Sequence, residues 1–389
     1  MKIGLVLDDS LDKSDGVQQY VLTLGRWYHQ QGHEVHYLVG ETHRRDIPRV
    51  HSLSRNVQVH FNQNRMSTPL PANRKRIKAL LETEKFDVLH VQMPYSPFMA
   101  GRVIRSAPLQ TALVGTFHII AFSWTERWAT RLLRLWLWRS RRRFDTVVSV
   151  SEPSRRFARQ GFSVKSSVLP NVVNRTAFHN GKRITKFDDG KINLVFLGRL
   201  VPRKGCRQLL EALEIMHEQQ LLSGLRVLIC GKGPEEMALK QFVRSHRLNR
   251  YVHFMGFIAE ADKPNYLATA DLAVFPSLGG ESFGIVLIEA MAARAGVVLG
   301  GNNSGYRSVL GERPHQLFDP LNSRQLAKTL KHFAFNTPER KRASAWQAEH
   351  ITHYDVAKVG PRLIRLYEQA IAKRRPETDN TKHELSAQG

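Results

Sequence analysis

The chain has little cysteine, no long apolar run and few acidic side chains for its length. Only Cys206 and Cys230 occur among the 389 residues. Neither belongs to a metal-ligand spacing, which argues against a disulfide framework and favours a reducing cytoplasm. No stretch reaches the roughly 18 apolar residues of a membrane span. Asp8 and Asp9 interrupt the first apolar run, which is too short for a signal peptide. Any contact with a membrane is therefore expected to be peripheral.

What the chain does have is positive charge. It carries 58 Lys and Arg against 34 Asp and Glu, a formal net charge of +24. Residues 1–175 hold 27 basic and 13 acidic side chains, and residues 176–389 hold 31 and 21. Such an excess favours polyanionic partners, namely anionic lipid, nucleic acid or phosphorylated substrates. Because 42% of the residues are hydrophobic, the chain can still bury a sizeable core.

Short apolar, β-branched runs alternate with helix-like segments along the whole chain. Continuous apolar strands between helices predict parallel sheets covered on both faces, so the two series predict an α/β protein with two doubly wound, Rossmann-like domains. The predicted strands are KIGLVL, HEVHYLV, VQVHF, DVLHV, TALVGTFH and TVVSVS in the first half, and INLVFLG, RVLICG, VHFMG, LAVFPS and VVLGG in the second.

The domain boundary is expected in residues 169–191, a polar and turn-rich stretch without periodicity. This divides the chain into an N-terminal domain over 1–172 and a C-terminal domain over 173–352. A last helix over about 353–373 is expected to cross back onto the N-terminal domain, and the polar tail 374–389 to be disordered.

Two segments of the second half carry residues suited to phosphate and sugar chemistry. In FLGRLVPRKG, residues 196–205, Arg199 and Lys204 are predicted to lie in an exposed loop after a strand and before a helix. Two cations beside a glycine turn at the carboxyl end of a parallel strand suit a diphosphate, although a solvated basic loop would have the same sequence.

The second segment, GGESFGIVLIEAMA, spans residues 279–292 and follows the strand LAVFPS. Open α/β sheets bind ligands at this position. Its glycines permit an unusual backbone path, and the helix expected to begin near Phe283 and Gly284 offers free N–H groups to a phosphate. Glu281 and Glu289 are poor phosphate ligands but good acceptors for sugar and ribose hydroxyls. Alone, such a pair can also be a helix-start glutamate followed by an ordinary helical one.

With these residues in place, the chain resembles the retaining glycosyltransferases of family four, which have the GT-B fold. The resemblance extends over nearly the whole chain and includes DGVQ, GTFH, GRLVPRKG and the E-x7-E spacing from Glu281 to Glu289. Within that family the chain looks most like the phosphatidylinositol mannosyltransferases.

The resemblance implies a role for each matching residue in donor binding and catalysis. Arg199 and Lys204 would neutralise the nucleotide diphosphate, and Glu289 would hold the ribose diol. Glu281 and the amides around Phe283, Gly284 and Ile285 would hold the donor sugar. Gly16 would let the backbone approach the phosphate, and His118, at the end of GTFH, would touch the sugar from across the cleft. Gln18 is the one implied acceptor contact.

The resemblance also implies a reaction. A hexose of mannose or glucose type would pass from GDP-mannose or a UDP-hexose with retention at the anomeric carbon, and the leaving phosphate would take the acceptor proton. Arg199 and Lys204 would stabilise its charge by preorganised electrostatics. The sequence has no D-x-D motif, so neither a metal nor a tightly bound cofactor is expected.

The acceptor is less well defined than the donor. Asp9, Tyr95 and Ile119 stand where the phosphatidylinositol mannosyltransferases would have polar inositol-facing residues, and Gln18 alone matches. Phosphatidylinositol or another lipid at the inner face of the cell membrane is one expectation. A polyol or other soluble acceptor, or a precursor of cell-envelope or capsule polysaccharide, is the alternative.

Two basic stretches of the first half suggest a membrane contact. Residues 123–144 hold seven arginines among tryptophans and leucines. On one helix, Arg127, Arg131, Arg134 and Arg141 would share a face, which describes either an interfacial helix or a core helix with a basic outer side. Residues 44–78 add a second cluster, followed by a helix beginning near Asn73.

We therefore expect a cytoplasmic enzyme bound peripherally to anionic membrane. The different-class alternative is a basic protein without catalysis that binds nucleic acid or membrane. No nucleic-acid-binding motif and no basic strand with stacking aromatics occurs in the sequence, so nucleic acid is not the expected partner.

Overall fold

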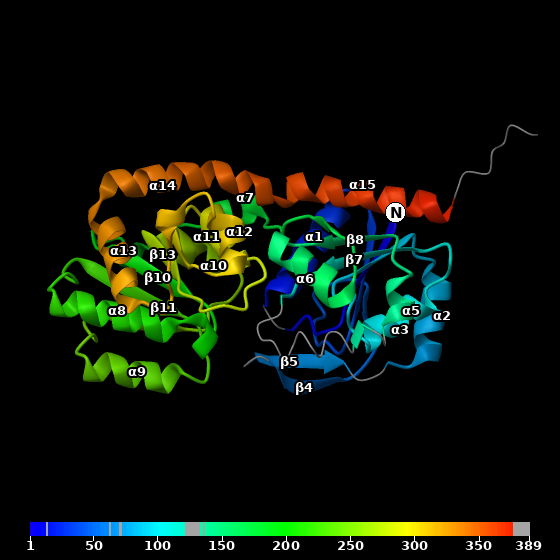
Figure 1. The fold of residues 1–389 in the computed structure, drawn as a ribbon, viewed down its shortest axis with the longest axis horizontal. Helices are drawn as coiled ribbons and strands as arrows, with labels where there is room; N and C mark the ends of the chain where they lie inside the picture. Colours follow the sequence, from blue (N-terminus) through cyan, green and yellow to red (C-terminus); the bar gives the residue numbers. More distant parts are fainter. Residues whose placement is uncertain (13–14, 62–63, 70–71, 121–132, 135–136, 376–389) are drawn as a thin grey trace, which may run out of the picture.

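The computed structural model describes residues 1–12, 15–61, 64–69, 72–120, 133–134 and 137–375. In these residues, two parallel sheets lie side by side and helices cover both faces of each (Figure 1). The two-sheet α/β architecture predicted from the alternation of apolar runs and helices is therefore confirmed.

The first sheet has seven strands in the order β3-β2-β1-β6-β7-β8-β9. The order reverses direction at β1, which pairs in parallel with β2 on one side and β6 on the other. The strands are β1 (Lys2–Leu7), β2 (Glu34–Val39), β3 (Val50–Ser52), β6 (Val88–Val91), β7 (Ala112–Phe117), β8 (Thr146–Ser149) and β9 (Ser167–Val168).

One predicted strand lies outside this sheet. The run VQVHF forms β4 (Asn56–Phe61), which pairs antiparallel with β5 (Asn64–Pro69) in a separate two-stranded sheet. The short β3 takes the edge position instead. Strict alternation of apolar and polar residues, as in Val57, Gln58, Val59 and His60, is typical of antiparallel strands with one solvated face. The expectation of a parallel strand here was wrong for that reason.

The second sheet has six strands in the order β12-β11-β10-β13-β14-β15. It reverses direction at β10, which pairs in parallel with β11 and β13. The strands are β10 (Ile192–Leu197), β11 (Leu225–Cys230), β12 (Val252–Gly256), β13 (Leu272–Phe275), β14 (Val297–Gly301) and β15 (Leu317–Phe318).

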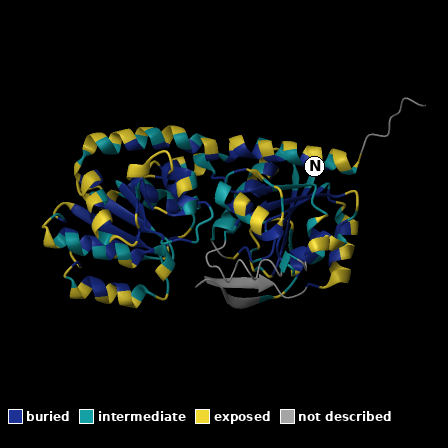
Figure 2. Cartoon of the chain, in the orientation of Figure 1, coloured by how far each residue is buried: buried dark blue, intermediate teal, exposed yellow. Residues whose placement is uncertain are grey.

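Buried apolar clusters line both faces of each sheet, and exposed residues concentrate on the outer sides of the helices (Figure 2). The helices are α1 (Gly16–Gln30), α2 (Arg74–Glu84), α3 (Met99–Ser106), α5 (Trp138–Arg141), α6 (Glu152–Phe162), α7 (Arg175–His179), α8 (Cys206–Glu218), α9 (Glu236–Ser245), α10 (Lys263–Thr269), α11 (Ile285–Ala292), α12 (Ser304–Leu310), α13 (Ser323–Phe335), α14 (Thr337–His350) and α15 (Val356–Arg374).

The chain crosses between the two sheets twice, and the crossings are hydrogen-bonded to each other. Val173 N donates to Tyr354 O at 3.0 Å, and Val356 N donates to Val173 O at 3.0 Å. Beyond this point α15 runs along the first sheet's half of the molecule (Figure 1). Its Tyr367 hydroxyl lies 2.9 Å from the Tyr28 hydroxyl of α1. The end of the described chain therefore packs onto its beginning.

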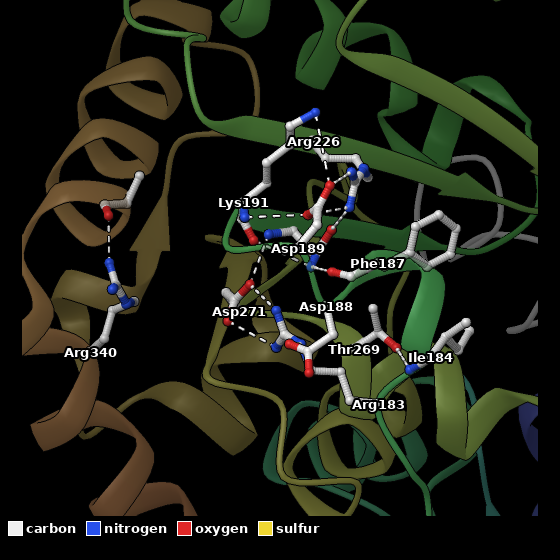
Figure 3. A network of polar contacts seen from close by, with 12 residues as sticks. Arg183, Ile184, Phe187, Asp188, Asp189, Lys191, Arg226, Thr269, Asp271 and Arg340 are labelled. Atoms are coloured by element: carbon white, nitrogen blue, oxygen red, sulfur yellow. Dashed lines mark hydrogen bonds and ion pairs between the residues drawn. The ribbon is translucent and has the colours of Figure 1, made fainter.

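The linker that precedes β10 is fastened to the amino ends of the central strands by ion pairs (Figure 3). Arg183 forms two bonds to Asp271, just before β13, at 3.0 and 2.9 Å. Arg226 of β11 holds Asp189 at 3.0 Å through Nη1. This network lies at the amino ends of the strands in the second sheet, whereas the two glycine-rich motifs follow the carboxyl ends of β10 and β13. It therefore stabilises the linker and leaves the carboxyl ends of the strands open.

The basic stretch over 123–144 is described only in part. Its first nine residues and its positions 132, 135 and 136 lie outside the described residues. In the described part, Leu137 is buried and Trp138 is 46% exposed, with the Arg142 guanidinium 4.3 Å from the Trp138 ring centroid. No helix in the described part of the chain is long and apolar enough to span a membrane.

Candidate functional site

A cavity of about 350 Å³ lies between the two sheets and is lined by residues from both. It collects the segments that follow β1 and β7 in the first sheet and β10 and β13 in the second. In each sheet the strand order reverses at one of these strands, and open parallel sheets bind ligands at such points.

Two helices begin at this cavity. Gly16 is the first residue of α1, and Ile285 is the first residue of α11. A Cβ atom on Gly16 would lie 2.9 Å from Ile285 Cδ1, so the glycine allows the two helix starts to approach. Gly284, at φ 114°, makes the turn before α11, and its left-handed conformation suits glycine. Both helices therefore direct unpaired N–H groups and the positive ends of their dipoles at one space.

Three cations lie on the second sheet's side. Arg199 follows β10, and Arg203 and Lys204 lie in the turn before α8. Gly205 closes this turn at φ 71°, where a Cβ atom would lie 2.0 Å from Pro276 O. Because glycine has no side chain, the turn can pack directly on the loop that follows β13 and carries Glu281. Lys204 was predicted to be exposed, but its side chain is only 21% exposed, against 38% for Arg199.

Glu281 forms ion pairs with Arg203 and Lys204. Its Oε1 accepts from Arg203 Nη1 at 2.7 Å, from Lys204 Nζ at 2.8 Å and from Ser277 Oγ at 2.9 Å. Burial alone would raise the pKa of Glu281, but the charges of Lys204 and Arg203 lower it to about 2. Burial lowers the pKa of Lys204, and Glu281 opposes that shift. The carboxylate thus stays ionised and holds two cations at the cavity wall.

Glu289, eight residues after Glu281, lies inside α11 and has a different environment. It is buried in α11, and its Oε1 lies 3.6 Å from Lys263 Nζ, which also lies 2.8 Å from Glu260 Oε1. Burial raises the pKa of Glu289, and the charge of Lys263 counteracts this. Within the described residues, Lys263 is the one cation in an ion pair with this carboxylate, which leaves acceptor capacity for a ligand hydroxyl.

His118 follows β7 and lines the cavity from the first sheet's side. Its Nε2 lies 3.0 Å from Gln92 Oε1, and the Tyr20 ring packs edge-on against it at 4.9 Å between centroids. Burial lowers the pKa of His118 to about 3, so the imidazole is neutral. On the same side of the cavity, Asp15 Oδ1 lies 3.7 Å from Arg199 Nε, in an ion pair that joins the two halves of the molecule.

The structure brings nearly all the sequence-predicted site residues to this one cavity. The lining includes Gly16, His118, Arg199, Lys204, Glu281, Phe283, Gly284, Ile285 and Glu289. Gln18 is the exception, because it is buried and does not line the cavity, whereas its neighbour Gln19 does.

Three functional neighbours were missed by the sequence analysis. Arg203 stands beside Lys204 in PRKG and could have been singled out as a third cation of that motif. Lys263 and Gln92 reach the site through long-range packing, and no local pattern marks them.

Two family models match the chain and divide it between them. A model described as Glycosyltransferase Family 4 matches residues 14–176, and a model described as Glycosyl transferases group 1 matches residues 178–348.

Curated relatives match the chain over almost its full length. The phosphatidyl-myo-inositol mannosyltransferase of Mycobacterium leprae (strain TN) is 31% identical over 374 residues, covering 95% of this chain and 96% of the relative. The protein of the same name from Mycobacterium tuberculosis (strain ATCC 25618 / H37Rv) is 30% identical over 376 residues, covering 95% and 97%.

Solved structures show the same fold at lower identity. HepE of Anabaena in complex with UDP and glucose superposes with a TM-score of 0.73 at 18% identity, covering 95% of this chain and 99% of HepE. Sucrose-phosphate synthase of Thermosynechococcus elongatus gives a TM-score of 0.74 at 18% identity, covering 96% and 99%. The two family models, the full-length relatives and the shared fold agree with one another. The chain therefore belongs to the family 4 glycosyltransferases with the GT-B fold, and it resembles the phosphatidylinositol mannosyltransferases.

Proposed function

We propose that this glycosyltransferase moves a hexose, with retention of anomeric configuration, from a nucleotide-diphosphate sugar to a lipid acceptor of phosphatidylinositol type at the cytoplasmic face of the membrane. The observation that carries the proposal is the convergence of two helix starts and three cations on one cavity. This arrangement suits a diphosphate because N–H groups, helix dipoles and charges all favour the same anion.

The donor would lie across the cavity, with its diphosphate between the two helix starts and near Arg199 and Lys204. Glu289 would accept from the ribose diol, since its carboxylate is shared with only one lysine. Glu281 would accept from sugar hydroxyls through Oε2, because Oε1 already takes three hydrogen bonds. His118 would contact the sugar from the opposite wall.

The transfer step needs no enzyme nucleophile. The bond between the anomeric carbon and the diphosphate oxygen breaks, and its electron pair leaves with the phosphate. The acceptor hydroxyl oxygen bonds to the same face of that carbon, and its proton passes to a leaving phosphate oxygen. Arg199 and Lys204 stabilise the negative charge that develops there, a role typically worth several kcal/mol per well-placed charge. None of these steps uses a metal ion.

Lipid is the acceptor that the surface charge and the relatives favour. The mycobacterial relatives are named as mannosyltransferases of phosphatidyl-myo-inositol. In this chain the start of α2 presents Arg74, Lys75, Arg76 and Lys78, all exposed, on the first sheet's half of the molecule. Their one described acidic partner is Glu82, 3.5 Å from Lys78. Such a cluster attracts anionic headgroups.

A soluble acceptor is the second candidate, and one residue favours it. Tyr95, at a position expected to face inositol, is buried at 9% exposure among Phe117 and Phe162. Its hydroxyl is therefore turned into the core of the first domain, and a polar contact to the lipid's inositol ring is lost. HepE, a structural neighbour, was crystallised with UDP and glucose.

A donor and acceptor screen tests the proposal. Purified protein is incubated with GDP-mannose, UDP-glucose, UDP-N-acetylglucosamine or UDP-galactose, and nucleoside diphosphate release is measured with and without vesicles containing phosphatidylinositol. We expect one donor to be preferred, release to rise with the lipid, and Arg199→Ala to abolish the rise. The exposed Arg244→Ala on α9 is the matched control and should behave as wild type.

The outcomes separate the candidates. Product found in the lipid phase supports the lipid acceptor. Release that responds only to soluble polyols or sugars favours the second candidate. No release with any donor, from protein that binds no nucleoside diphosphate in calorimetry, contradicts the assignment of the cavity to a nucleotide sugar.

A further inference from the structure

Gln92 is a fully buried polar residue of the first domain that the proposed mechanism does not use. It directly follows β6, and its backbone N–H donates to Val6 O at 2.9 Å, which fixes its position beside β1. Its side chain is 0% exposed and points at His118, which lines the cavity. A buried amide next to a site histidine can determine how that histidine forms hydrogen bonds.

The orientation of the Gln92 amide is determined by its second partner. Nε2 of Gln92 donates to the His90 carbonyl oxygen at 3.3 Å, which leaves Oε1 facing His118 Nε2 at 3.0 Å. In the reversed orientation, Gln92 Oε1 would face the His90 carbonyl oxygen, and two oxygens would oppose each other. At the other end, the Gln92 NH₂ group would face the N–H of His118 if the proton of His118 stayed on Nε2. Because an amide oxygen can only accept, the proton of His118 lies on Nε2.

His90 is itself held in place, so this orientation has a rigid base. Its Nδ1 lies 2.6 Å from the Tyr367 hydroxyl of α15, and its Nε2 lies 2.6 Å from Thr116 Oγ1 of β7. Both contacts are buried. The chain from α15 through His90 to Gln92 therefore fixes the amide that contacts His118.

We propose that Gln92 is a positioning residue that keeps the proton of His118 on Nε2, so that Nδ1 is left as a hydrogen-bond acceptor for one hydroxyl group of the donor sugar. The inference deepens the proposed function and rests on it for the identity of the ligand. Among the described residues Nδ1 has no hydrogen-bond partner, so it is the polar ring atom left for a ligand in the cavity.

Burial keeps His118 neutral, because it lowers the pKa of the imidazole to about 3. Tyr20 of α1 and His90 of β6 are the titratable groups packed near it; burial raises the pKa of Tyr20 and lowers that of His90 to about 3. Asp15, Arg199, Lys204 and Glu281 line the same cavity. A neutral, acceptor-only nitrogen selects a hydroxyl and rejects a donor analogue that lacks it, because the buried acceptor is then left unpaired.

The first test reads the tautomer without any substrate. Nitrogen NMR of histidine-labelled protein distinguishes protonated from unprotonated ring nitrogens, and His118→Gln assigns the signal among the 17 histidines. We expect a neutral ring protonated at Nε2 that does not titrate between pH 5 and 8. A proton on Nδ1, or titration in that range, overturns the proposal even if the donor remains unidentified.

The second test changes Gln92 in two ways. Gln92→Glu places a carboxylate beside Nε2, which raises the pKa of His118 and puts a second proton on Nδ1. We expect kcat to fall about 10- to 100-fold near neutral pH and to recover as the pH rises. Gln92→Leu keeps a side chain of similar size but removes the hydrogen-bond acceptor, so the proton of His118 is no longer held on Nε2. This variant should lower kcat by a similar factor at every pH. Gln241→Glu, exposed on α9, makes the same charge change away from the site and should leave the profile unchanged.

The third test identifies the hydroxyl. Wild-type protein should discriminate against one deoxy analogue of the preferred donor by about 10- to 100-fold, and Gln92→Leu should discriminate far less. Affinity for free nucleoside diphosphate should stay the same in all variants. If both Gln92 variants lose nucleotide affinity and thermal stability together, with no change in pH profile or deoxy-sugar preference, Gln92 is only a packing residue. Failure of the proposed function would be seen differently, as no turnover by wild-type protein.

Discussion

The two domains carry positive charge in opposite ways. In the second domain three basic residues at the cavity are partly or fully buried and are paired with carboxylates: Arg203 and Lys204 with Glu281, and Lys263 with Glu289 and Glu260. In the first domain the basic residues at the start of α2 are exposed, and within the described part of the chain their ion-pair partner is Glu82. Paired charges at a cavity wall suit one small anion in a fixed geometry, whereas exposed charges with few acidic partners suit an extended anionic surface. The comparison teaches that net charge alone does not reveal what a basic protein binds.

The largest effect on turnover is expected from the paired cations. Arg199→Ala or Lys204→Ala should each lower turnover by about 100- to 1,000-fold, since each removes a charge that faces the leaving diphosphate. Arg199→Ala should leave the urea midpoint unchanged, because its side chain is 38% exposed. Lys204→Ala should also reduce stability, because buried Glu281 loses one of its two cations. Steady-state nucleoside diphosphate release measures the first effect. Near-normal turnover in both variants would remove these residues from catalysis.

The next effect concerns the exposed cations of the first domain. Changing Arg74, Lys75, Arg76 and Lys78 together to Ser should lower binding to phosphatidylglycerol vesicles roughly 1,000-fold at low salt, since each of the four surface charges contributes about 1 kcal/mol. Binding should weaken as salt shortens the Debye length to about 8 Å. Donor hydrolysis should stay near wild type because the cavity is unaltered. Vesicle flotation tests this, and equal flotation with neutral vesicles would break the comparison between the domains.

Glu281 and Glu289 sharpen the comparison within the cavity. Glu281→Ala should abolish sugar transfer while nucleoside diphosphate still binds. Glu289→Ala should weaken nucleotide binding by about tenfold to a hundredfold, because a hydrogen bond to a charged group contributes about 1.5–3 kcal/mol. Calorimetry with free nucleotide separates the two glutamates. The opposite pattern, with affinity lost in Glu281→Ala and kept in Glu289→Ala, would exchange their roles.

The two domains should also respond to pH with opposite signs. Burial raises the pKa of Asp8, at the end of β1, to about 6, against the hydrogen bonds from Ser96 and Ala100. The protonated Asp8 therefore favours the folded state. This contribution to stability is fully present below pH 3.8, the pKa of Asp8 in the unfolded chain, and is lost as the pH rises through about 6, its pKa in the folded protein. The pKa of Glu281 is lowered to about 2, so its contribution is present above the unfolded value of 4.5 and is lost as pH falls toward 2.

Urea unfolding at a series of pH values measures both effects. Asp8→Asn should flatten the decline in stability between pH 4 and 6, and Glu281→Gln should flatten the rise between pH 2 and 4.5. Each effect is expected to amount to about 1–3 kcal/mol. If Asp8→Asn leaves the slope between pH 4 and 6 unchanged, Asp8 is ionised in the folded protein.

The smallest effect is expected at Trp138. With 46% of its surface exposed, Trp138→Ala should change the free energy of unfolding by no more than about 0.5 kcal/mol. Its buried neighbour is the control, because Leu137→Ala should destabilise the protein by about 2–5 kcal/mol. If Trp138→Ala also lowers vesicle binding, Trp138 belongs to the membrane surface. Unfolding of the protein by Trp138→Ala would assign it to packing instead.

The second domain could be predicted from the sequence more completely than the first. Its strands are continuous apolar runs, and its site residues lie in two short motifs that each follow a predicted parallel strand, so Arg199, Lys204 and Glu281 could be expected at one edge of the sheet. The ion pair of Arg203 with Glu281 and that of Lys263 with Glu289 depend on how a loop and a helix pack, which no local spacing encodes.

In the first domain, local pattern was a weaker guide. The alternation of apolar and polar residues in VQVHF is typical of an antiparallel strand, which β4 is. The regular succession of strands and helices along the chain predicted a parallel strand there instead. Gln92 lies 26 residues before His118, and only the pairing of β6 with β7 brings them together. The burial of Tyr95 likewise results from packing against Phe117 and Phe162, which are distant in the chain.

The packing of α15 on α1 has a consequence for how the protein is made. The strands of the first domain are translated before the second domain, but the helix that covers Tyr28 and supplies Tyr367 to His90 is translated after it. Ribosomes add about 5–20 residues each second, so roughly 10 to 40 seconds separate the first domain from its final helix. During that interval the second domain is translated, and the face of α1 that receives Tyr367 stays uncovered. The first domain therefore cannot complete its packing until the second domain has been translated.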